Sequence, residues 1–567
     1  MVLVMILIFI SWIYIVFTTI NLGFQFDKIF KLKCTNFIFI SFLGLLSTTI
    51  IASFWAIFGR INIEFHLFLI VLNGLILFKS KSEIASIYKD IITQIDDLST
   101  ELKGLLLVIS VLIIAQTAAS PFIIDNETYY VQTIKWLNEY GFVKGLGNLH
   151  IFFGQTSGWH IAQSVFNFSF LYENFNDLSG FCLLLGNLFV ILKLNLYFKN
   201  NNKIFLIIGF LPVFNVLFFQ FISAPSPDIA VYIISFLLFS LFLENYNNTK
   251  PETLNLMFIL CCFLLFIKST SIIIFLIPIF SAFKTHKNSI KKLLPAVLAG
   301  SLLFILFIIK NTIITGCPLY PTQLIEVTTF DFTIPKELMS FYFNKAKLYS
   351  FFLTNAEFNS MTIFQIMIKW LTYSGISAFF NILSLILIVL IPFYIYKFNN
   401  KKEFWLLYTI MVFQLFILLI TSPQFRFFLN FILFFSCYVL ACLFQSKKLI
   451  MSIIYSSTII AVVLVLLPLK MNGFTKNKLF NNTSNFQFEN IILPNKNSNI
   501  SLYNKQKNGN LNYYSPDKNS YFWYSGNGNL PCVNSQQLDY FKTYFNIIPQ
   551  QRTNDLKDGF YSKKSIQ

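Results

Sequence analysis

Six charged residues are the groups in this sequence best suited to chemistry. They are Asp125, Glu127, Asp228, Lys268, Lys310 and Arg426. The first two acids belong to the segment DNETYY at 125–130, and the third ends the segment SAPSPD at 223–228. The three basic residues stand at the ends of long apolar runs, where charge is costly and usually functional. Cations in such positions are what a lipid-phosphate substrate would need.

Each of these residues also has a purely structural explanation. Aspartate is favoured just before a first helical turn, so Asp125 is a candidate N-cap, as is Asp228 for a helix starting at Ile229. Glu127, inside the first turn, suits the helix dipole. Lysine and arginine at helix ends often extend toward lipid headgroups. The residues alone leave these alternatives open.

Histidine and tryptophan residues follow Asp125 in the same polar region. His150 and His160 lack a third ligand at metal-binding spacing, so we expect them to be hydrogen-bonding loop residues. Trp136 and Trp159 are most simply anchors at the membrane interface, with sugar stacking as the alternative.

The elements that must position these residues are membrane-spanning helices. The chain has 567 residues, of which 56% are hydrophobic and 12% charged, and its mean hydropathy is +0.66. Apolar runs recur without the alternation of a membrane β-barrel, and in lipid only a helix satisfies its own backbone hydrogen bonds. The composition predicts an all-α integral membrane protein with about 14 transmembrane helices over residues 1–469.

Lysine-rich loops recur between alternate spans, which predicts their orientation by the positive-inside rule. Taking these loops as cytoplasmic puts both termini outside the cell membrane, together with two long outer loops at 122–178 and 310–373. A helix over 131–140, ended by Gly141, is predicted to lie in the membrane interface. Residues 470–567 form a polar outer tail, either a small domain or a partly disordered segment.

The net charge of +17 does not indicate nucleic-acid binding. The basic residues are spread over short loops and the tail, with no basic stripe, and membrane topology explains them better. We therefore expect membrane lipids as partners and no nucleic acid.

The order and sidedness of the motifs resemble a known superfamily. The acid opening the first outer loop, the Ser-Pro-Asp turn, the Lys-Ser-Thr sequence at 268–270 and the stretch from Lys310 to Pro321 are similar to the bacterial GT-C-type glycosyltransferases, in a poorly characterised branch. The resemblance covers about residues 122–427. Related proteins often carry His after the Tyr of Asp-x-x-x-Tyr, where this chain has Tyr130.

This resemblance implies an enzyme and assigns roles to the residues. A polytopic transferase would move a sugar from a polyprenyl-phosphate donor to a glycan or lipid acceptor of the cell envelope. Asp125 would be the general base, and the departing phosphate would be bound by Lys268, Lys310 and Arg426. Glu127 and Asp228 would support it, by orienting the acceptor or holding a divalent cation; the sequence assigns no other cofactor.

Two further classes remain as alternatives. An O-antigen-type polymerase or ligase also has large outer loops, but basic loop residues rather than a carboxylate are expected to dominate its site. A transporter or flippase of lipid-linked glycans would place charges at the middle of several helices, and only Lys193 and Lys268 are candidates for this. In all three cases we expect a bacterial cytoplasmic (inner) membrane protein.

Overall fold

The computed structural model describes residues 6–121, 123–173, 176–285, 290–322, 330–373, 375–467, 490, 492–517 and 520–564. Ten helices in these ranges are long and apolar enough to cross a membrane. They are α1 (Ile6–Phe30), α2 (Phe37–Phe58), α5 (Thr100–Ala118), α8 (Leu178–Asn200), α9 with η4 and α10 (Lys203–Ile222), α11 (Pro227–Asn245), α14 (Leu294–Thr315), α18 (Ile376–Phe398), α19 (Lys402–Ile420) and α21 (Lys447–Leu466). The expectation of an all-α multi-pass membrane protein is confirmed.

The expected number of about fourteen spans is not confirmed, because fewer helices of the described chain reach the length of a span. Helix α3 (Ile63–Lys79) bends by 95° into α4 (Lys81–Asp96), and this pair counts as one further span at most. Three more predicted spans coincide with shorter apolar helices: α12 (Pro251–Ile267), η5 with α13 (Ser269–Lys284) and α20 (Leu429–Leu443). A straight helix of 15 to 17 residues is shorter than the roughly 20 residues that a bilayer core requires.

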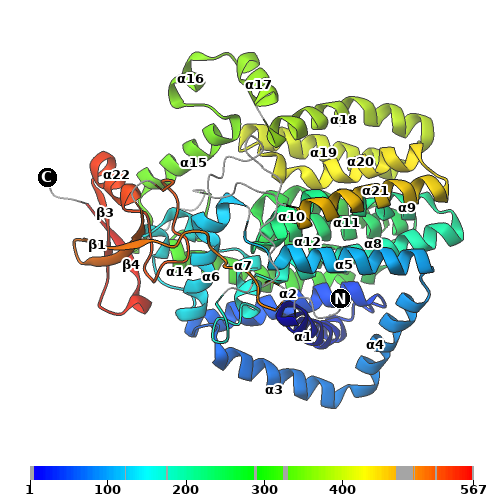
Figure 1. Cartoon of the computed structure of the whole chain (residues 1–567), viewed down its shortest axis with the longest axis horizontal. Coiled ribbons are helices and arrows are strands. Elements are labelled where there is room, and N and C mark those ends of the chain that lie inside the picture. Colours follow the sequence, from blue (N-terminus) through cyan, green and yellow to red (C-terminus); the bar gives the residue numbers. More distant parts are fainter. Residues whose placement is uncertain are drawn as a thin grey trace.

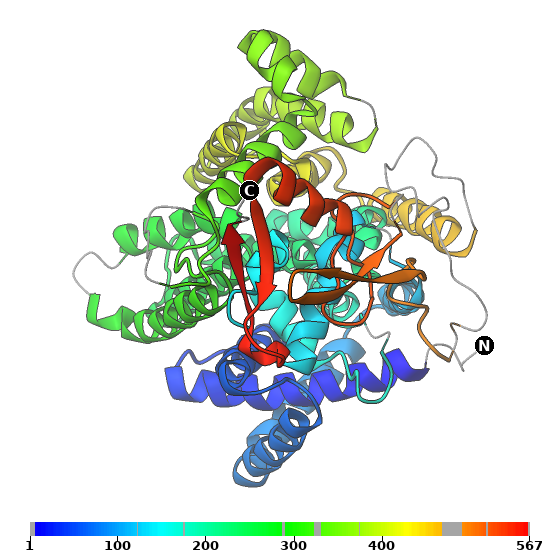
Figure 2. The ribbon, with the colours of Figure 1, turned by 90° about the vertical axis from the view of Figure 1, so that its left-hand side faces the viewer.

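Most of the long helices, among them α5, α8, α18, α19 and α21, lie side by side, whereas α1 is seen nearly end-on (Figure 1). The lysine-containing loops that follow α8, α18 and α20 lie at one end of this bundle. Lys199 pairs with Asp97 at 2.5 Å and Lys447 with Glu101 at 2.7 Å. The hydroxyl of Tyr197, near the end of α8, donates to the carbonyl of Gln445 at 2.9 Å and joins α8 to the loop between α20 (Leu429–Leu443) and α21. The described parts of the first predicted outer loop and of the tail occupy the opposite end (Figures 1 and 2).

The helix predicted over 131–140 forms, but it does not lie against lipid. Helix α6 (Val131–Glu139) follows the π-helical turn η1 (Asn126–Tyr130), and Gly141 beyond it has a φ of +73°. Both its polar and apolar faces are buried. Gln132 Nε2 donates to Gly528 O at 2.7 Å in the tail. The amphipathic pattern was read correctly as a helix, but protein covers it from both sides.

A group of short helices projects from the same end. Helices α15 (Lys336–Phe351), α16 (Asn355–Ser360) and α17 (Ile363–Thr372) extend beyond the bundle (Figure 1). Trp370 Nε1 donates to Pro423 O at 3.0 Å, which joins α17 to the loop between α19 and α20.

The described part of the tail is folded onto the bundle. Strands β1 (Tyr503–Asn508) and β2 (Leu511–Pro516) pair antiparallel, as do β3 (Ile547–Gln551) and β4 (Phe560–Lys564), with α22 (Ser535–Phe545) between them. Figure 2 shows these elements in front of the bundle end. Phe541 and Ile547 of the tail share a small core with Ile151 of the first outer loop and with Leu338 of α15. The predicted tail boundary near residue 470 lies outside the described residues.

Candidate functional site

A cavity of about 1770 Å³ opens at the end of the bundle that carries the tail. Its walls come from η1, helix α7 (Gly158–Val165), the break between α12 and η5, the end of α14, α15, the α19–α20 loop and the tail. Asp125, Lys268, Lys310 and Arg426 all line it, although they are separated by up to 301 residues in the chain. Asp228 is buried directly behind this lining, and Glu127 faces elsewhere.

Asp125 is held by contacts that a helix cap would not make. Its side chain makes no capping hydrogen bond to the helix that follows it. Instead Oδ2 pairs with Arg426 Nη1 and accepts a weak hydrogen bond from the Tyr130 hydroxyl at 3.4 Å. Among the described residues no donor reaches Oδ1. The capping explanation for Asp125 is therefore wrong, and one carboxylate oxygen remains for another partner.

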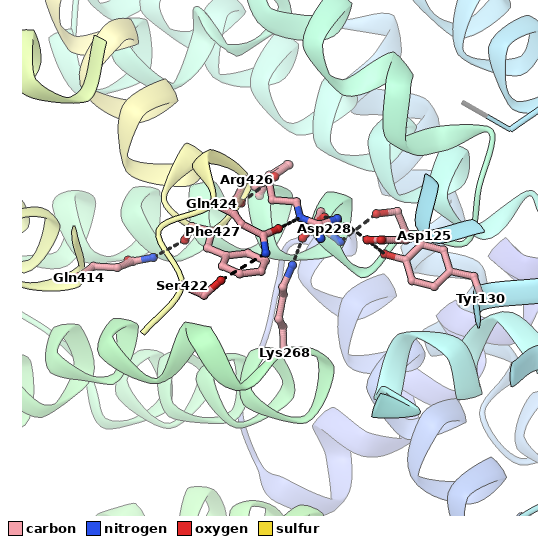
Figure 3. Close-up of polar contacts among 11 residues, drawn as sticks. Asp125, Tyr130, Asp228, Lys268, Gln414, Ser422, Gln424, Arg426 and Phe427 are labelled. Atoms are coloured by element: carbon pink, nitrogen blue, oxygen red, sulfur yellow. Dashed lines mark hydrogen bonds and ion pairs between the residues drawn. The ribbon is translucent and has the colours of Figure 1, made fainter. Parts of the chain in front are cut away.

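Asp228 is not a cap either. Helix α11 begins at Pro227, and the Ser226 hydroxyl caps it by accepting from the Asp228 amide at 3.3 Å. The Asp228 side chain, 1% exposed, pairs through Oδ1 with Lys268 Nζ. Its Oδ2 lies 3.8 Å from Arg426 Nη1. A chain of alternating charge thus runs from Asp125 through Arg426 and Asp228 to Lys268 (Figure 3).

Arg426 and Lys268 are fixed in place rather than extended toward lipid headgroups. Gln424 Oε1 accepts from Arg426 Nε at 2.9 Å, and the Tyr232 hydroxyl donates to the Arg426 carbonyl at 2.8 Å. Lys268 Nζ lies 4.3 Å from the centre of the Phe427 ring (Figure 3). Both cations are paired with a carboxylate, so the snorkelling explanation is wrong for them.

Lys310 differs from the other two cations. Its side chain, on α14, is buried, and Nζ donates to the amide oxygen of Asn311. Nζ also lies 5.4 Å from the centre of the Phe307 ring. No carboxylate of the described chain pairs with it. A buried ammonium without a counter-ion is costly, and an anion bound in the cavity would offset that cost.

Charge on the cavity wall is strongly one-sided. Among the described lining residues the only carboxylate is that of Asp125, whereas five cations occur. The cations are Lys268, Lys310, Lys345, Lys347 and Arg426. Lys345 and Lys347 lie on α15, inside the predicted outer loop, and nothing in the sequence separates them from other loop lysines. With Asp228 included, these groups sum to +5 − 2 = +3, which favours an anionic ligand.

His160 adds a neutral donor to the same wall. Nδ1 accepts from the Ser157 amide at 3.3 Å, which places the ring proton on Nε2. Burial, and then the positive charges of Lys310 and Lys268, lower the pKa of His160 to about 3. Nε2 is buried and has no hydrogen-bond partner in the described structure. Sequence reasoning took this residue for a loop histidine, because its place beside the two lysines depends on the fold.

The other histidine and the two tryptophans have structural surroundings. His150 Nε2 bonds to Trp523 O at 3.1 Å in the tail, and burial lowers the pKa of His150 to about 4. Trp136 packs edge-on against Phe560, with ring centres 5.7 Å apart. Trp159 is completely buried and donates through Nε1 to the Ser179 hydroxyl at 3.2 Å. Neither tryptophan reaches the cavity or a lipid surface, so both expected roles, interfacial anchor and sugar stacking, are wrong.

Glu127 fastens the tail to the turn that carries Asp125. Its carboxylate, 1% exposed, accepts from the Ser498 hydroxyl at 2.6 Å and from the Asn499 amide at 2.8 Å. Its carbonyl accepts from the amides of Ser525 and Gly526, both at 2.8 Å. Glu127 therefore supports the site through the tail, without facing the cavity.

The docking of the tail should weaken as pH rises, because burial raises the pKa of Glu127. A carboxyl whose folded-state pKa is raised binds its proton more tightly when folded, so its stabilising effect is greatest below the ordinary value of about 4.3. That effect is lost as pH rises through the folded-state pKa. The protection of the Ser525 and Gly526 amides, measured relative to their intrinsic exchange rate at each pH, should fall over this interval. Glu127→Gln keeps the size and removes the titration, so protection that still falls with pH in this variant would contradict the assignment.

A metal centre has no visible ligand set. The described residues contain no group of three His, Cys, Asp or Glu side chains that could hold a metal ion. The two acids considered for a divalent cation have separate partners: Glu127 contacts the tail, and Asp228 contacts Lys268. The cavity wall instead offers donors and cations.

Comparison with known proteins connects the chain to one family. No curated protein and no solved structure matches it. A family model described as "Domain of unknown function (DUF8201)" matches residues 5–433, which include the whole bundle up to α20 and every charged group of the alternating chain in Figure 3. Because this match covers more than half of its length, the protein belongs to the DUF8201 family.

Proposed function

We propose that this protein is a GT-C-type glycosyltransferase. It would transfer a sugar from a polyprenyl-phosphate donor to a glycan or lipid acceptor of the cell envelope, on the outer face of a bacterial cytoplasmic membrane. The observation that carries the proposal is the cavity at the bundle end, where Asp125 meets several cations beside apolar helices. A phosphate ester on a lipid carrier matches both the charge and the membrane setting.

The reaction assigns each group a task. The acceptor hydroxyl attacks the anomeric carbon of the donor sugar, and its proton passes to Asp125 Oδ1, the oxygen that no described donor occupies. The bond from the anomeric carbon to the phosphate oxygen breaks, and the electron pair leaves with the phosphate. General-base catalysis of this kind contributes typically about 10²- to 10⁴-fold. The resting ion pair to Arg426 orients the carboxylate through Oδ2.

The leaving phosphate is stabilised by one cation and one neutral donor, neither of which is paired with a carboxylate in the described structure. Lys310 has no described counter-ion, and His160 Nε2 is a buried donor in the same wall. Lys268 and Arg426 are already neutralised by Asp228 and Asp125. They can add only N–H donors beside the phosphate, whereas Lys310 makes the direct contact with it.

The polymerase or ligase class is the second candidate, favoured by one observation. The cavity wall carries five cations and one carboxylate among the described residues. Basic groups would dominate the site of such an enzyme in the same way. The two classes differ in their need for Asp125, which only the first uses as a base. A transporter is less favoured, because Lys193, its other candidate charge, pairs with Glu244 at 2.7 Å and is not among the lining residues.

The proposal is tested with the purified protein in proteoliposomes. Polyprenyl-phosphate sugars carrying a radiolabel are offered with bacterial envelope glycolipids, and transfer of label is followed by extraction and chromatography. We expect transfer by the wild-type protein that needs both substrates. Chain-length growth from a polyprenyl-diphosphate glycan, without use of the monophosphate donor, would contradict this function and support the polymerase class.

The orientation of the bundle gives a further expected result. The exposed residue Asn554 of the tail should react, as Asn554→Cys, with a membrane-impermeant maleimide in intact spheroplasts. Ser446→Cys, in a lysine-rich loop at the opposite end, should react only after permeabilisation. The parent protein measures the background from its own cysteines. Labelling of the Ser446→Cys variant in intact spheroplasts would place the cavity on the wrong side for this function.

A further inference from the structure

We propose that Tyr521 and Trp523 of the tail form a saccharide-binding subsite that holds the acceptor glycan against Asp125. The assignment to the acceptor rests on the proposed function, whereas the binding of a saccharide does not. Both residues line the cavity, although they lie about 395 positions after Asp125 and outside the residues that match the family model. The tail is thereby a part of the substrate site rather than an appendage.

The tail backbone is fixed where these two rings leave it. The amides of Ser525 and Gly526 donate to the Glu127 carbonyl, and the Ser525 hydroxyl donates to Thr128 O at 2.8 Å. Just before them, Trp523 O is bonded to His150 Nε2 at 3.1 Å. The segment is tied on both sides to the loop that carries Asp125, so the positions of the rings relative to the base are set by buried hydrogen bonds.

Tyr521 keeps exposed surface, and Trp523 keeps part of its surface although it packs against the small core of the tail. Tyr524, beside them, is 5% exposed and belongs to the packing of the tail, whereas Tyr521 is 40% exposed. The Trp523 ring is half-buried and meets Phe152 edge-on, with ring centres 4.9 Å apart. Tyr349 of α15, 49% exposed, lines the same cavity. Aromatic rings of this kind present an apolar face and a polar edge, the combination that a sugar ring with its C–H face and hydroxyls can use.

Polar groups on the same wall distinguish a saccharide from a lipid chain. Gln155, Thr156 and Asn344 line the cavity with the aromatic rings. Gln155 Nε2 donates to the Tyr342 hydroxyl, so even the deeper aromatic ring is part of a hydrogen-bonded set. A polyprenyl chain offers no hydrogen-bond partner to the remaining donors and acceptors of these groups, so covering them with lipid would be unfavourable. A glycan supplies hydroxyls for them.

The location of Tyr521 favours the acceptor over the donor sugar. Tyr521 lines the same cavity as Asp125, and the hydrogen bonds from Ser525 and Gly526 to Glu127 and Thr128 tie this tail segment to the turn that carries Asp125. The cation assigned to the donor phosphate, Lys310, comes from the end of α14. A glycan stacked on Tyr521 and Trp523 would present a hydroxyl to Asp125 from the tail side.

Direct binding tests the subsite without requiring transfer. The full-length protein in nanodiscs is titrated with a panel of fluorescent hexose and N-acetylhexosamine oligosaccharides, and anisotropy reports binding. We expect wild-type protein to bind at least one member. Trp523→Ala and Tyr521→Ala should each weaken that binding about tenfold, which corresponds to about 1.4 kcal/mol. Trp523→Phe should restore most of it, because phenylalanine keeps an aromatic face. Tyr544→Ala is the matched control, since Tyr544 is a tail aromatic, 68% exposed, that is not among the lining residues.

The outcomes separate this subsite from the proposed function. Binding of none of the oligosaccharides, or equal binding by wild type, Trp523→Ala and Tyr521→Ala, would overturn the subsite even if transfer depends on Asp125. If transfer does not depend on Asp125 but the tail variants lose binding, the general-base mechanism of the proposed transferase is overturned and the saccharide subsite is retained. If Trp523→Ala fails to fold, the partly exposed Tyr521 still decides, and in an active protein both variants should raise the KM for the acceptor and leave that for the donor unchanged.

Discussion

Asp125→Asn is expected to abolish sugar transfer while the protein stays folded and abundant. Asparagine has nearly the same volume but cannot accept the proton of the acceptor hydroxyl, so the loss should be on the order of 10²-fold or more. Because the Asp125 side chain makes no capping hydrogen bond, the helix that follows should not depend on it. The measurement is transfer from a polyprenyl-phosphate donor in membranes lacking the native protein, with the expression level determined for each variant.

The substitution also removes one ion pair, and its cost is small. The Asp125 and Arg426 side chains are 16% and 23% exposed, and Arg426 keeps Asp228 at 3.8 Å and Gln424 at 2.9 Å. The guanidinium is therefore not left without a counter-charge. A loss of activity at normal abundance would consequently report on proton transfer rather than on unfolding.

A matched variant at the other end of the bundle controls for loss of an ion pair alone. Asp97→Asn removes a carboxylate that pairs with Lys199 at 2.5 Å among exposed side chains, far from the cavity in the fold. Exposed pairs of this kind contribute about 0–1 kcal/mol, so activity should stay near the wild-type level. Full activity of Asp125→Asn at normal abundance would rule out the general base and leave the polymerase class ahead.

The sequence predicted the bundle well because a bilayer leaves few choices. Apolar runs in lipid must be helical, and the ends of these runs are marked by charged and turn-forming residues. The difficult segments were the ones where protein replaces lipid as the surroundings. Helix α12, 17 residues long, ends at Ile267, and the next residue, Lys268, pairs with the buried Asp228. Length and hydropathy do not reveal such a partner.

The candidate site could be predicted only in part, for a related reason. Asp125 and Arg426 stand out because each is a charge beside lipid, but the fact that they pair across 301 residues depends on the fold. Tyr521 and Trp523 carry no such signal, because aromatic residues are common throughout this chain. The amphipathic pattern of α6 indicated a helix but does not distinguish a helix covered by lipid from one covered by the tail. Tertiary contacts decide these points, and a single sequence does not encode them locally.

Lys310→Met should strongly reduce sugar transfer without destabilising the protein. Methionine keeps the apolar stem and removes the charge, and no described carboxylate is left unpaired by the change. The buried ammonium costs desolvation in the resting protein, so the melting temperature should be unchanged or higher. Loss of one preorganised group that stabilises the leaving phosphate should lower kcat by about 10²- to 10³-fold.

Lys268→Met is the matched control, because the same substitution there should act through stability. It removes the partner of Oδ1 of Asp228, which is 1% exposed, and leaves this carboxylate only the Arg426 guanidinium at 3.8 Å from Oδ2. Breaking a buried ion pair by removing one partner costs about 3–5 kcal/mol, so the melting temperature and the yield should fall. Thermal unfolding and single-turnover transfer, measured on both variants, separate the two effects. A stable and fully active Lys310→Met protein would show that the unpaired ammonium does not bind the donor phosphate, and the phosphate contact would then have to be sought at Arg426 and Lys268.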